Sequence, residues 1–367
     1  MRMLGVSVYP EKSTFAQDKQ YLDLAHKYGY QRVFTSLLQL VGANGEDILA
    51  KFKQVVGYAN YLGMKVIVDI NPSLFSSLNI KYDDLAFFAK LKVWGLRLDE
   101  GFSGLEEAQM TRNPYGLKIE LNMSRGTHYL EQIMDYAPNV DNLWGCHNFY
   151  PQAYTGLSED IFLKYSQPYR QFNIHSAAFI SSQVATTGPW AVSEGLPTLE
   201  SDRQRAVSSQ VNHLLLTNMV DDIIVGNAYA SKEELANIAA AFKAPQPFLH
   251  VQLNSQISGI ERQIVLDEVQ LYRGDASAYL LRSSSSRVKY RQAVIAPLNL
   301  NNEENFQRGD IIVVNDKYER YKGELQIALR SFTNDGRRNV VGRITDSDLP
   351  LLAYLQPWQS FKLVEQK

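Results

Sequence analysis

The chain has 367 residues, a length that suits two domains or one barrel with a smaller appended domain. Hydrophobic residues make up 45% and charged residues 21%, which excludes a mainly disordered, collagen-like or coiled-coil protein. With 37 Lys and Arg against 39 Asp and Glu, the formal net charge of -2 lacks the basic excess of a nucleic-acid-binding protein.

Cysteine usage and the N-terminal residues bear on the compartment. Cys146 is the single cysteine, so the chain forms no internal disulfide and no cysteine-only zinc site, which fits a reducing environment. The first apolar stretch is too short for a secretory signal, and no apolar run is long enough to span a bilayer. We therefore expect a cytoplasmic protein with neither membrane nor nucleic acid as partner; a homo-oligomer stays an open alternative.

The first 250 residues alternate short apolar runs with amphipathic stretches, a pattern typical of strand–helix units. Helical spacing places Tyr21, Leu24, Ala25 and Tyr28 on one stripe, and Ser13 or Thr14 can cap that helix. Strands are predicted at Leu4–Tyr9, Arg32–Leu37, Lys65–Ile70, Leu96–Asp99, Lys118–Asn122, Leu143–Phe149, Phe172–Ile180 and Asp222–Asn227. Helices are predicted at Phe15–Tyr28, Glu46–Leu62, Tyr82–Leu91, Thr127–Tyr136, Glu159–Arg170 and Asp202–Asn218.

Eight such units are the repeat number of a TIM (β/α)8 barrel, which we predict for residues 1–244. The alternative, a doubly wound open sheet, needs a glycine-rich phosphate loop after its first strand. The segment Ser7–Glu11 has no such glycines. The α/β class with a closed barrel is therefore favoured.

A second, β-rich domain is predicted for residues 248–367. Pro245 and Pro247 mark a linker, and turn residues separate the short apolar runs that follow. The predicted strands are His250–Leu253, Gln263–Leu266, Ala278–Leu281, Gln292–Ile295, Asp310–Val314, Glu324–Ala328, Val340–Ile344 and Phe361–Val364.

Two neighbouring barrel strands bring carboxylates to the end where TIM barrels carry their chemistry. Because strand residues alternate between the two faces, Arg97 and Asp99 share the interior face of one strand, and Glu120 and Asn122 that of the next. A close Asp99–Glu120 pair suits glycosidic bond cleavage, in which one carboxyl group protonates the leaving oxygen. The alternative is an internal salt-bridge network that only fills the barrel.

Other polar residues fall near the same strand ends and are candidates for contacts to a sugar. Some of them lie in the runs that end the first, third and sixth predicted strands, where hydroxyl, amide and aromatic groups can bond and stack on a sugar. His147 is equally well explained as a structural histidine. These candidate binding residues are Ser7, Tyr9, Glu11, Asp69, His147, Asn148, Tyr150 and Tyr154.

Metal binding has little support. The six histidines include no HExxH motif and no His-x-His pair, and a divalent ion on Asp69, Asp99 and Glu120 is the weaker interpretation of those carboxylates. We expect no metal and no cofactor. In the second domain, Arg282, Arg287 and Glu324 stand out, because arginine makes bidentate contacts to phosphate and carboxylate groups. A solvated basic strand edge explains the same arginines.

Several stretches together resemble the 6-phospho-N-acetylmuramidases, a bacterial family that has also carried the name outer surface protein. The resemblance covers essentially the whole chain, and HNFYPQAYTGLS is its most specific part. The stretches are Leu4–Pro10, Val33–Leu37, Leu96–Phe102, Glu120–Ser124, His147–Ser158, Gly309–Asn315 and Tyr321–Leu325. Glu100 and Arg125 depart from the family pattern and bear on subsite preference.

The resemblance implies a TIM barrel followed by a small cyclophilin-like domain. It implies hydrolysis of the glycosidic bond beside 6-phosphorylated N-acetylmuramic acid, joined to N-acetylglucosamine, during peptidoglycan recycling in the cytoplasm. The phosphate and the lactyl carboxylate of that substrate need cations. The candidates are Arg97, Arg125, Arg282, Arg287 and Lys322.

Two other functions fit the same residues. A phosphosugar isomerase, epimerase or aldolase would use Glu120 or His147 as a proton-transfer base, together with a metal. A non-catalytic protein would bind phosphorylated sugars without cleaving them. Loss of turnover with a metal chelator would favour the isomerase, epimerase or aldolase over a hydrolase. Binding of the sugar without turnover would favour the non-catalytic protein.

Overall fold

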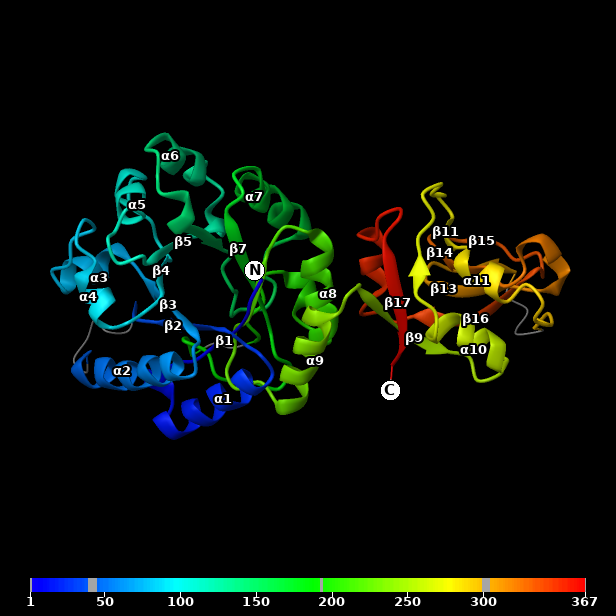
Figure 1. Cartoon of the computed structure of the whole chain (residues 1–367), viewed down its shortest axis with the longest axis horizontal. Helices are drawn as coiled ribbons and strands as arrows, with labels where there is room; N and C mark the ends of the chain where they lie inside the picture. The colour runs from blue at the N-terminus through cyan, green and yellow to red at the C-terminus, as the bar shows by residue number, and fades with distance from the viewer. Residues whose placement is uncertain (1, 39–44, 192–193, 299–303, 367) are drawn as a thin grey trace. The chain divides into compact units, whose positions relative to one another are not determined.

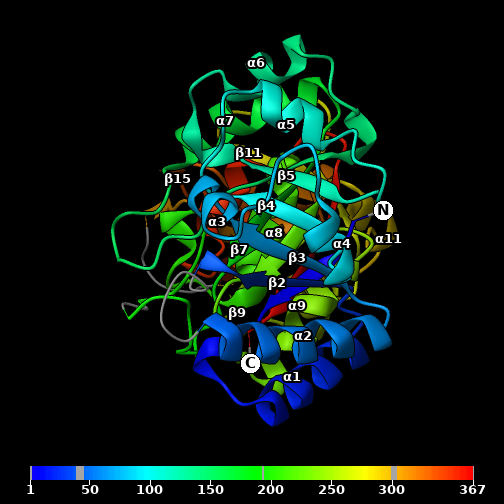
Figure 2. The ribbon, with the colours of Figure 1, turned by 90° about the vertical axis from the view of Figure 1, so that its left-hand side faces the viewer.

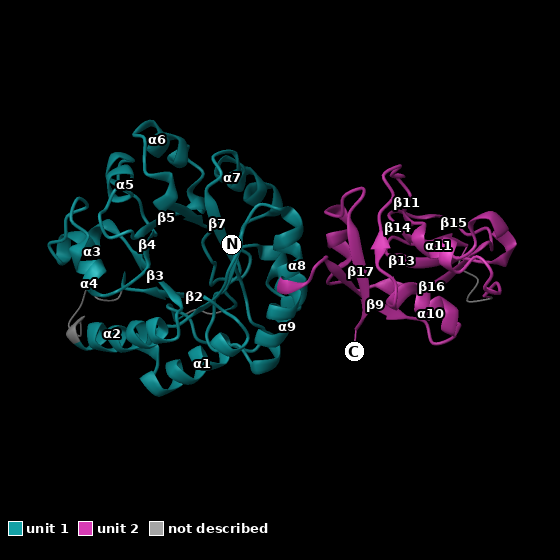
Figure 3. Cartoon of the chain, in the orientation of Figure 1, with its two compact units in different colours: residues 1–242 teal, residues 243–367 magenta. Residues whose placement is uncertain are grey.

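The computed structural model describes residues 2–38, 45–191, 194–298 and 304–366. The chain divides into two compact units, residues 1–242 and residues 243–367 (Figure 3). Of the helices within these described ranges, none combines the length and the apolar character needed to cross a membrane.

In the first unit, strands β1 to β8 pair in chain order, all parallel, and close into a barrel with helices outside it (Figure 1). The predicted TIM barrel is confirmed. The observed strands mostly end one to three residues before the predicted ends, because the last residues of each run turn into the loops. The strands are β1 Leu4–Ser7, β2 Arg32–Ser36, β3 Lys65–Ile70, β4 Gly95–Leu98, β5 Lys118–Asn122, β6 Leu143–Cys146, β7 His175–Ile180 and β8 Asp222–Val225.

The first helix illustrates how the sequence sets these boundaries. The Thr14 side chain accepts a hydrogen bond from the Gln17 backbone at 3.4 Å, and the Gln17 side chain accepts one from the Thr14 backbone at 3.1 Å. This capping box selects Thr14 over Ser13 as the cap. Helices α1 and α2 then pack side by side (Figures 1 and 2). The helices are α1 Phe15–Lys27, α2 Gly45–Tyr61, α3 Pro72–Ser77, α4 Ala86–Lys90, α5 Leu105–Met110, α6 Tyr129–Asp135, α7 Glu159–Gln171, α8 Val207–Thr217 and α9 Lys232–Lys243.

A buried ionic cluster holds the interior of the barrel. Arg32 has no exposed side-chain surface; its guanidinium donates to Asp222 at 3.0 Å and also to Glu120. Asp222 in turn accepts from the Met3 backbone at 2.7 Å and contacts His175 at 2.8 Å. Burial raises the pKa of the Glu120 carboxyl, and the positive charge of Arg32 opposes that rise. These groups join β2, β5, β7 and β8, and the residue that precedes β1, across the barrel.

The second unit is β-rich, as predicted. Its main sheet has the order β10-β17-β9-β16-β13-β14-β11, and β12 pairs with β15. All its pairings are antiparallel except that between β17 and β9. The elements are β9 Phe248–Leu253, α10 Gly259–Leu266, β10 Gln270–Leu271, β11 Leu280–Ser283, α11 Ser285–Lys289, β12 Asn305–Phe306, β13 Asp310–Val314, η6 Asp316–Tyr321, β14 Leu325–Ala328, β15 Phe332–Thr333, β16 Arg338–Ile344, η7 Leu349–Ala353 and β17 Ser360–Glu365.

Two predicted strands of this unit are wrong. Residues Gln263–Leu266 end helix α10, because a capping box between Ser258 and Glu261 starts a helix that buries Ile264 and Val265. Residues Gln292–Ile295 form no strand. The strands β10, β12 and β15 were not predicted, since two residues are too few to show a period-two pattern.

The buried cluster predicts a large stability effect for Arg32. Arg32→Met keeps most of the side-chain volume but leaves Glu120 and Asp222 as uncompensated buried charges, so the free energy of unfolding should fall by about 3–5 kcal/mol. Urea unfolding followed by circular dichroism measures it. Lys53→Met, which removes an exposed cation of the same unit, is the control and should have little effect. Equal losses in the two variants would contradict the assigned role of the cluster.

Candidate active site

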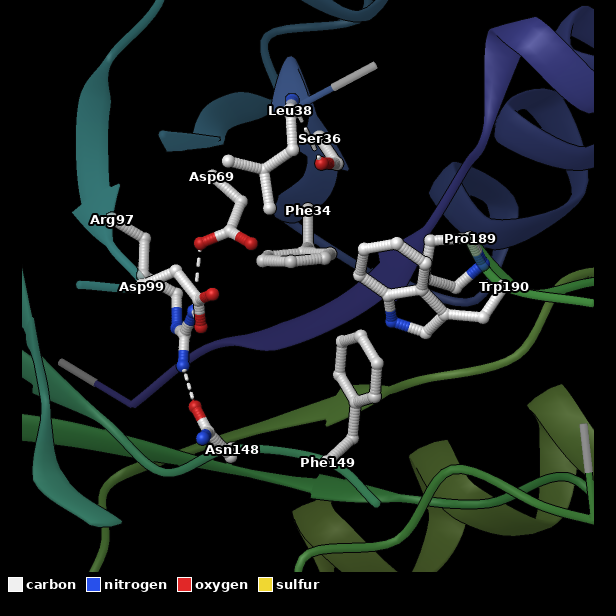
Figure 4. A pocket seen from close by; sticks show the side chains of 10 residues that line it. All are labelled: Phe34, Ser36, Leu38, Asp69, Arg97, Asp99, Asn148, Phe149, Pro189 and Trp190. Carbon is white, nitrogen blue, oxygen red and sulfur yellow. Dashed lines mark hydrogen bonds and ion pairs between the residues drawn. The ribbon is translucent and has the colours of Figure 1, made fainter. Parts of the chain in front are cut away.

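A pocket of about 160 Å³ opens at the carboxyl ends of the barrel strands (Figure 4). Ser36 ends β2, Asp69 lies near the end of β3, Asp99 follows β4, and Asn148 follows β6. This is the end of the barrel at which TIM-barrel enzymes hold their substrates. The lining residues are Phe34, Ser36, Leu38, Asp69, Arg97, Asp99, Asn148, Phe149, Pro189 and Trp190.

Arg97 organises the polar side of the pocket. One guanidinium nitrogen, Nη1, donates to Asp69 at 2.7 Å and to Asp99 at 3.3 Å. The other, Nη2, donates to the side-chain oxygen of Asn148. The Arg97 side chain is only 3% exposed, so these three partners compensate a charge that water cannot reach. One buried arginine thereby sets the position of two carboxylates and an amide.

The two carboxylates have different environments. The Asp69 side chain is 8% exposed and that of Asp99 is 37% exposed. Burial raises the pKa of Asp69 to about 7, the nearby charge of Asp99 adds to the rise, and Arg97 opposes it. Asp69 can therefore hold a proton near neutral pH beside a second carboxylate that faces solvent.

Aromatic side chains form the opposite side. Figure 4 shows Phe34, Phe149 and Trp190 across the pocket from the charged group. The rings of Phe34 and Phe149 meet edge to face with centroids 6.0 Å apart, and Trp190 is 49% exposed. A pocket with aromatic walls and a few fixed polar groups suits a ligand with both apolar faces and hydroxyl groups, such as a sugar.

The structure brings four predicted site residues together in this pocket: Asp69, Arg97, Asp99 and Asn148. Asn122 lies next to it, where its side chain donates to the backbone carbonyl of Asp99 at 2.9 Å. Asn122 therefore holds the segment that carries Asp99.

Glu120 is placed differently from the expectation of a close Asp99–Glu120 pair. Its side chain has no exposed surface, contacts Arg32 and does not line the pocket. The strand register puts Glu120 beside Arg97, as expected from alternation, but the side chain turns to the buried Arg32 from the start of β2. The carboxylate that faces Asp99 is Asp69 instead.

His147 is a buried structural residue in this structure. Its Nε2 lies 2.9 Å from Ser166 Oγ and its Nδ1 lies 3.1 Å from Ser124 Oγ. Burial lowers the pKa of His147 to about 3, so the ring is neutral. Ser124 Oγ also accepts from the Asn148 backbone at 3.0 Å. His147 thus supports the segment bearing Asn148 and does not line the pocket.

The remaining barrel candidates also lie outside the pocket lining. Tyr9 is buried and donates to the Gly226 carbonyl at 2.6 Å, and Ser7, two residues earlier, is buried as well. Burial raises the pKa of Glu11, which lies in the short helix η1 Pro10–Lys12. Tyr150 is partly buried and Tyr154 is 93% exposed. In the second unit, Arg282 and Arg287 border a separate groove.

Six lining residues were not predicted. Phe34 and Ser36 lie on one face of the predicted strand Arg32–Leu37, so strand alternation applied to that strand would have found them. Phe149 follows the observed end of β6, where alternation no longer applies. Leu38, Pro189 and Trp190 lie in loops without a periodic pattern, and only the folded chain brings them to the pocket. Over the part of the chain that the structure describes, no group of three His, Cys, Asp or Glu residues is arranged to hold a metal ion.

Two family models match the chain. The model described as 6-phospho-N-acetylmuramidase, N-terminal, matches residues 4–240, and its C-terminal counterpart matches residues 247–364. The chain belongs to the 6-phospho-N-acetylmuramidase family. It is therefore a member of a family of glycosidases, in agreement with the sequence resemblance.

Two solved structures match over nearly the whole chain. The crystal structure of an uncharacterized B. cereus protein is 41% identical, covers 99% of both chains and has a TM-score of 0.90. A conserved protein of unknown function from Enterococcus faecalis is 24% identical with a TM-score of 0.74, covering 99% of this chain and 96% of that chain, and supports the fold alone. No curated protein matches the chain.

The pocket predicts one aspartate that titrates near neutrality. In carboxyl-labelled protein, one aspartate resonance should titrate at about pH 7 and should vanish in Asp69→Asn. Arg97→Gln should move that titration to higher pH, because the positive charge that favours the ionised form is gone. The exposed Asp135→Asn is the control. A spectrum without such a titration would show that Asp69 is ionised throughout the neutral range.

Proposed function

We propose that this protein hydrolyses the glycosidic bond beside 6-phospho-N-acetylmuramic acid, in its disaccharide with N-acetylglucosamine. The observation that carries the proposal is the pair of carboxylates, Asp69 and Asp99, on one buried arginine in a pocket with aromatic walls. Glycoside hydrolases need one carboxyl group to protonate the leaving oxygen and a second to act at the sugar carbon. Family membership supports the substrate class.

Asp69 is the proton donor in this proposal. Its pKa of about 7 keeps a proton available at neutral pH for the leaving-group oxygen. Asp99, the more exposed carboxylate, acts on the sugar carbon or on the attacking water. Arg97 holds both groups and stabilises the negative charge that Asp69 acquires when it gives up its proton.

The spacing of the two carboxylates favours retention of configuration. Since both bond Arg97 Nη1, at 2.7 and 3.3 Å, their bonded oxygens lie within about 6 Å of each other. Retaining enzymes place their carboxyl groups about 5–5.5 Å apart, whereas inverting enzymes leave about 6.5–9.5 Å for a water molecule. Attack by the N-acetyl group of the substrate, with Asp99 assisting, is the alternative that the same spacing allows.

The phosphate and lactyl groups require cations beyond Arg97, which already has three partners. Arg125 is exposed, follows β5, and has its guanidinium over the Tyr129 ring at 4.7 Å. Gly101, two residues after Asp99, lies very close to Arg125, since a Cβ atom added to this glycine would be only 2.6 Å from Arg125 Nη1. Arg125 therefore borders the segment that carries Asp99, and we assign it to an anionic group of the substrate.

A phosphorylated sugar carries charge that does not cross a lipid bilayer, so the proposed reaction takes place where the sugar is phosphorylated. Together with the substrate class of the family, this supports a cytoplasmic role in peptidoglycan recycling with a small phosphorylated sugar as partner. The cyclophilin-like fold of the second unit is part of the same family-based proposal.

The isomerase alternative loses its proposed bases. Glu120 is bound to Arg32 inside the barrel, and His147 has a pKa lowered to about 3 by burial. Neither lines the pocket. Measured turnover distinguishes the proposed hydrolase from a non-catalytic binding protein.

The first test is cleavage of the phosphorylated disaccharide beside its unphosphorylated counterpart, followed by mass spectrometry with and without EDTA. We expect cleavage of the phosphorylated sugar alone, unaffected by EDTA. Asp99→Asn should lower kcat by about 100-fold or more, and Glu131→Gln, outside the pocket lining, should leave it unchanged. Binding of the sugar without cleavage by the wild-type protein would contradict the proposal.

The second test separates the roles of the two aspartates. The kcat/KM of the wild-type protein should fall above pH about 7, as Asp69 loses its proton. Asp69→Asn should lose most activity on the natural disaccharide, but retain far more on a phosphorylated nitrophenyl glycoside, whose leaving group needs no protonation. Asp99→Asn should fail on both. Equal losses of Asp69→Asn on the two substrates would exclude Asp69 as the proton donor.

A further inference from the structure

The second unit contains a groove of about 880 Å³ whose walls are strongly basic. Its lining includes six cations against two carboxylates, Asp275 and Glu319, although the whole chain has a net charge of -2. Such a local excess creates a positive potential that attracts anions. The six cations are Arg273, Arg282, Arg287, Arg291, Arg320 and Lys322.

Two arginines of the groove share one carboxylate. Arg273 makes a bidentate contact to Asp275 with two distances of 2.7 Å, and Arg282 donates to the same carboxylate at 2.8 Å. The third nitrogen of Arg273 donates to Ser284 Oγ at 3.1 Å. The hydrogen bond from Arg273 holds the pKa of Asp275 down at about 2, so this carboxylate stays ionised. Two guanidinium groups are thereby fixed side by side.

A buried carboxylate, that of Glu324, contacts two residues at the groove. Glu324 has no exposed side-chain surface, yet it accepts from Ser284 Oγ at 2.8 Å and from Gln326 Nε2 at 2.9 Å, and lies 3.8 Å from Arg287 Nη1. The Arg287 guanidinium also lies 5.5 Å from the centre of the Tyr321 ring. Burying a charge is costly, and Glu324 is placed where it orients Arg287 and Ser284 toward one region.

Two further arginines are uncompensated. Arg291 and Arg320 are exposed, and neither forms an ion pair with any residue in the described ranges. A solvated basic strand edge would not require the buried Glu324 or the fixed Arg273–Asp275–Arg282 arrangement. These two observations together favour a ligand site over the strand-edge interpretation.

We propose that this groove binds a phosphomonoester attached to a sugar-sized group. Several guanidinium forks match the oxygens of a phosphate dianion better than they match one carboxylate. The volume is in the range of small-molecule sites and much exceeds one phosphate ion. The inference needs no glycosidase activity and so stands apart from the proposed function. The phosphate has two sources: the glycoside substrate itself or a separate phosphorylated sugar.

The test is calorimetric titration of the full chain with N-acetylglucosamine 6-phosphate, with unphosphorylated N-acetylglucosamine as the ligand control. The wild-type protein should bind the phosphorylated sugar alone. Arg287→Ala should weaken binding by about tenfold or more, the effect of losing one charge-assisted contact. Arg291→Ala combined with Arg320→Ala, at exposed positions that leave the fold intact, should also weaken it.

The matched control removes two exposed arginines of the same unit outside the groove, Arg308 and Arg330, as Arg308→Ala combined with Arg330→Ala. It should bind as the wild type does. Equal weakening by this control would reduce the effect to general charge attraction and overturn the proposal. So would unchanged binding in both groove variants, or no binding by the wild-type protein.

A kinetic arm identifies the source of the phosphate. If the groove takes the phosphate of the glycoside substrate, Arg287→Ala should raise its KM with little change in kcat. If it takes a separate phosphorylated sugar, KM should be unchanged while calorimetric binding is weakened. Failure of cleavage in the wild-type protein would refute the proposed function and leave the binding result standing.

Discussion

The contact between Arg97 and its three partners is the constraint on which the barrel pocket depends. The guanidinium is buried and joins Asp69 of β3, Asp99 after β4 and Asn148 after β6. A charge in that position has to be compensated, so Arg97 requires these partners to stay in contact with it. Because Asp69 shares this arginine with a second carboxylate and is also buried, it can hold a proton at neutral pH.

A second buried arginine explains why the other interior carboxylate is not available. Arg32 binds Glu120 and Asp222 in a layer nearer the starts of β2 and β8. The barrel interior therefore contains two arginine-centred layers. One is closed and joins strands; the other opens to a pocket. The division between structural and reactive carboxylates follows from which arginine each one contacts.

The cavities of the two units differ in their charged residues. The barrel pocket has two carboxylates and one arginine, whereas the groove of the second unit has a clear excess of arginine and lysine. Acid chemistry at a glycosidic bond needs carboxylates, and recognition of a phosphate needs cations. Each cavity has the composition for one of these tasks, and each is supported by a buried charged residue, Arg97 in the barrel pocket and Glu324 at the groove.

The sequence by itself determined the alternation of strands and helices, the interior position of Arg97, and the β-rich character of the second unit. These depend on local periodicity and on capping residues such as Thr14, which act within a few positions along the chain. The choice of Asp69 over Glu120 as the neighbour of Asp99 was decided only by the tertiary structure. Both carboxylates lie on interior faces. Arg32 binds Glu120 although the two residues are 88 positions apart in sequence, so only the folded chain shows this contact. Trp190 likewise reaches the pocket from a loop whose path no local pattern encodes.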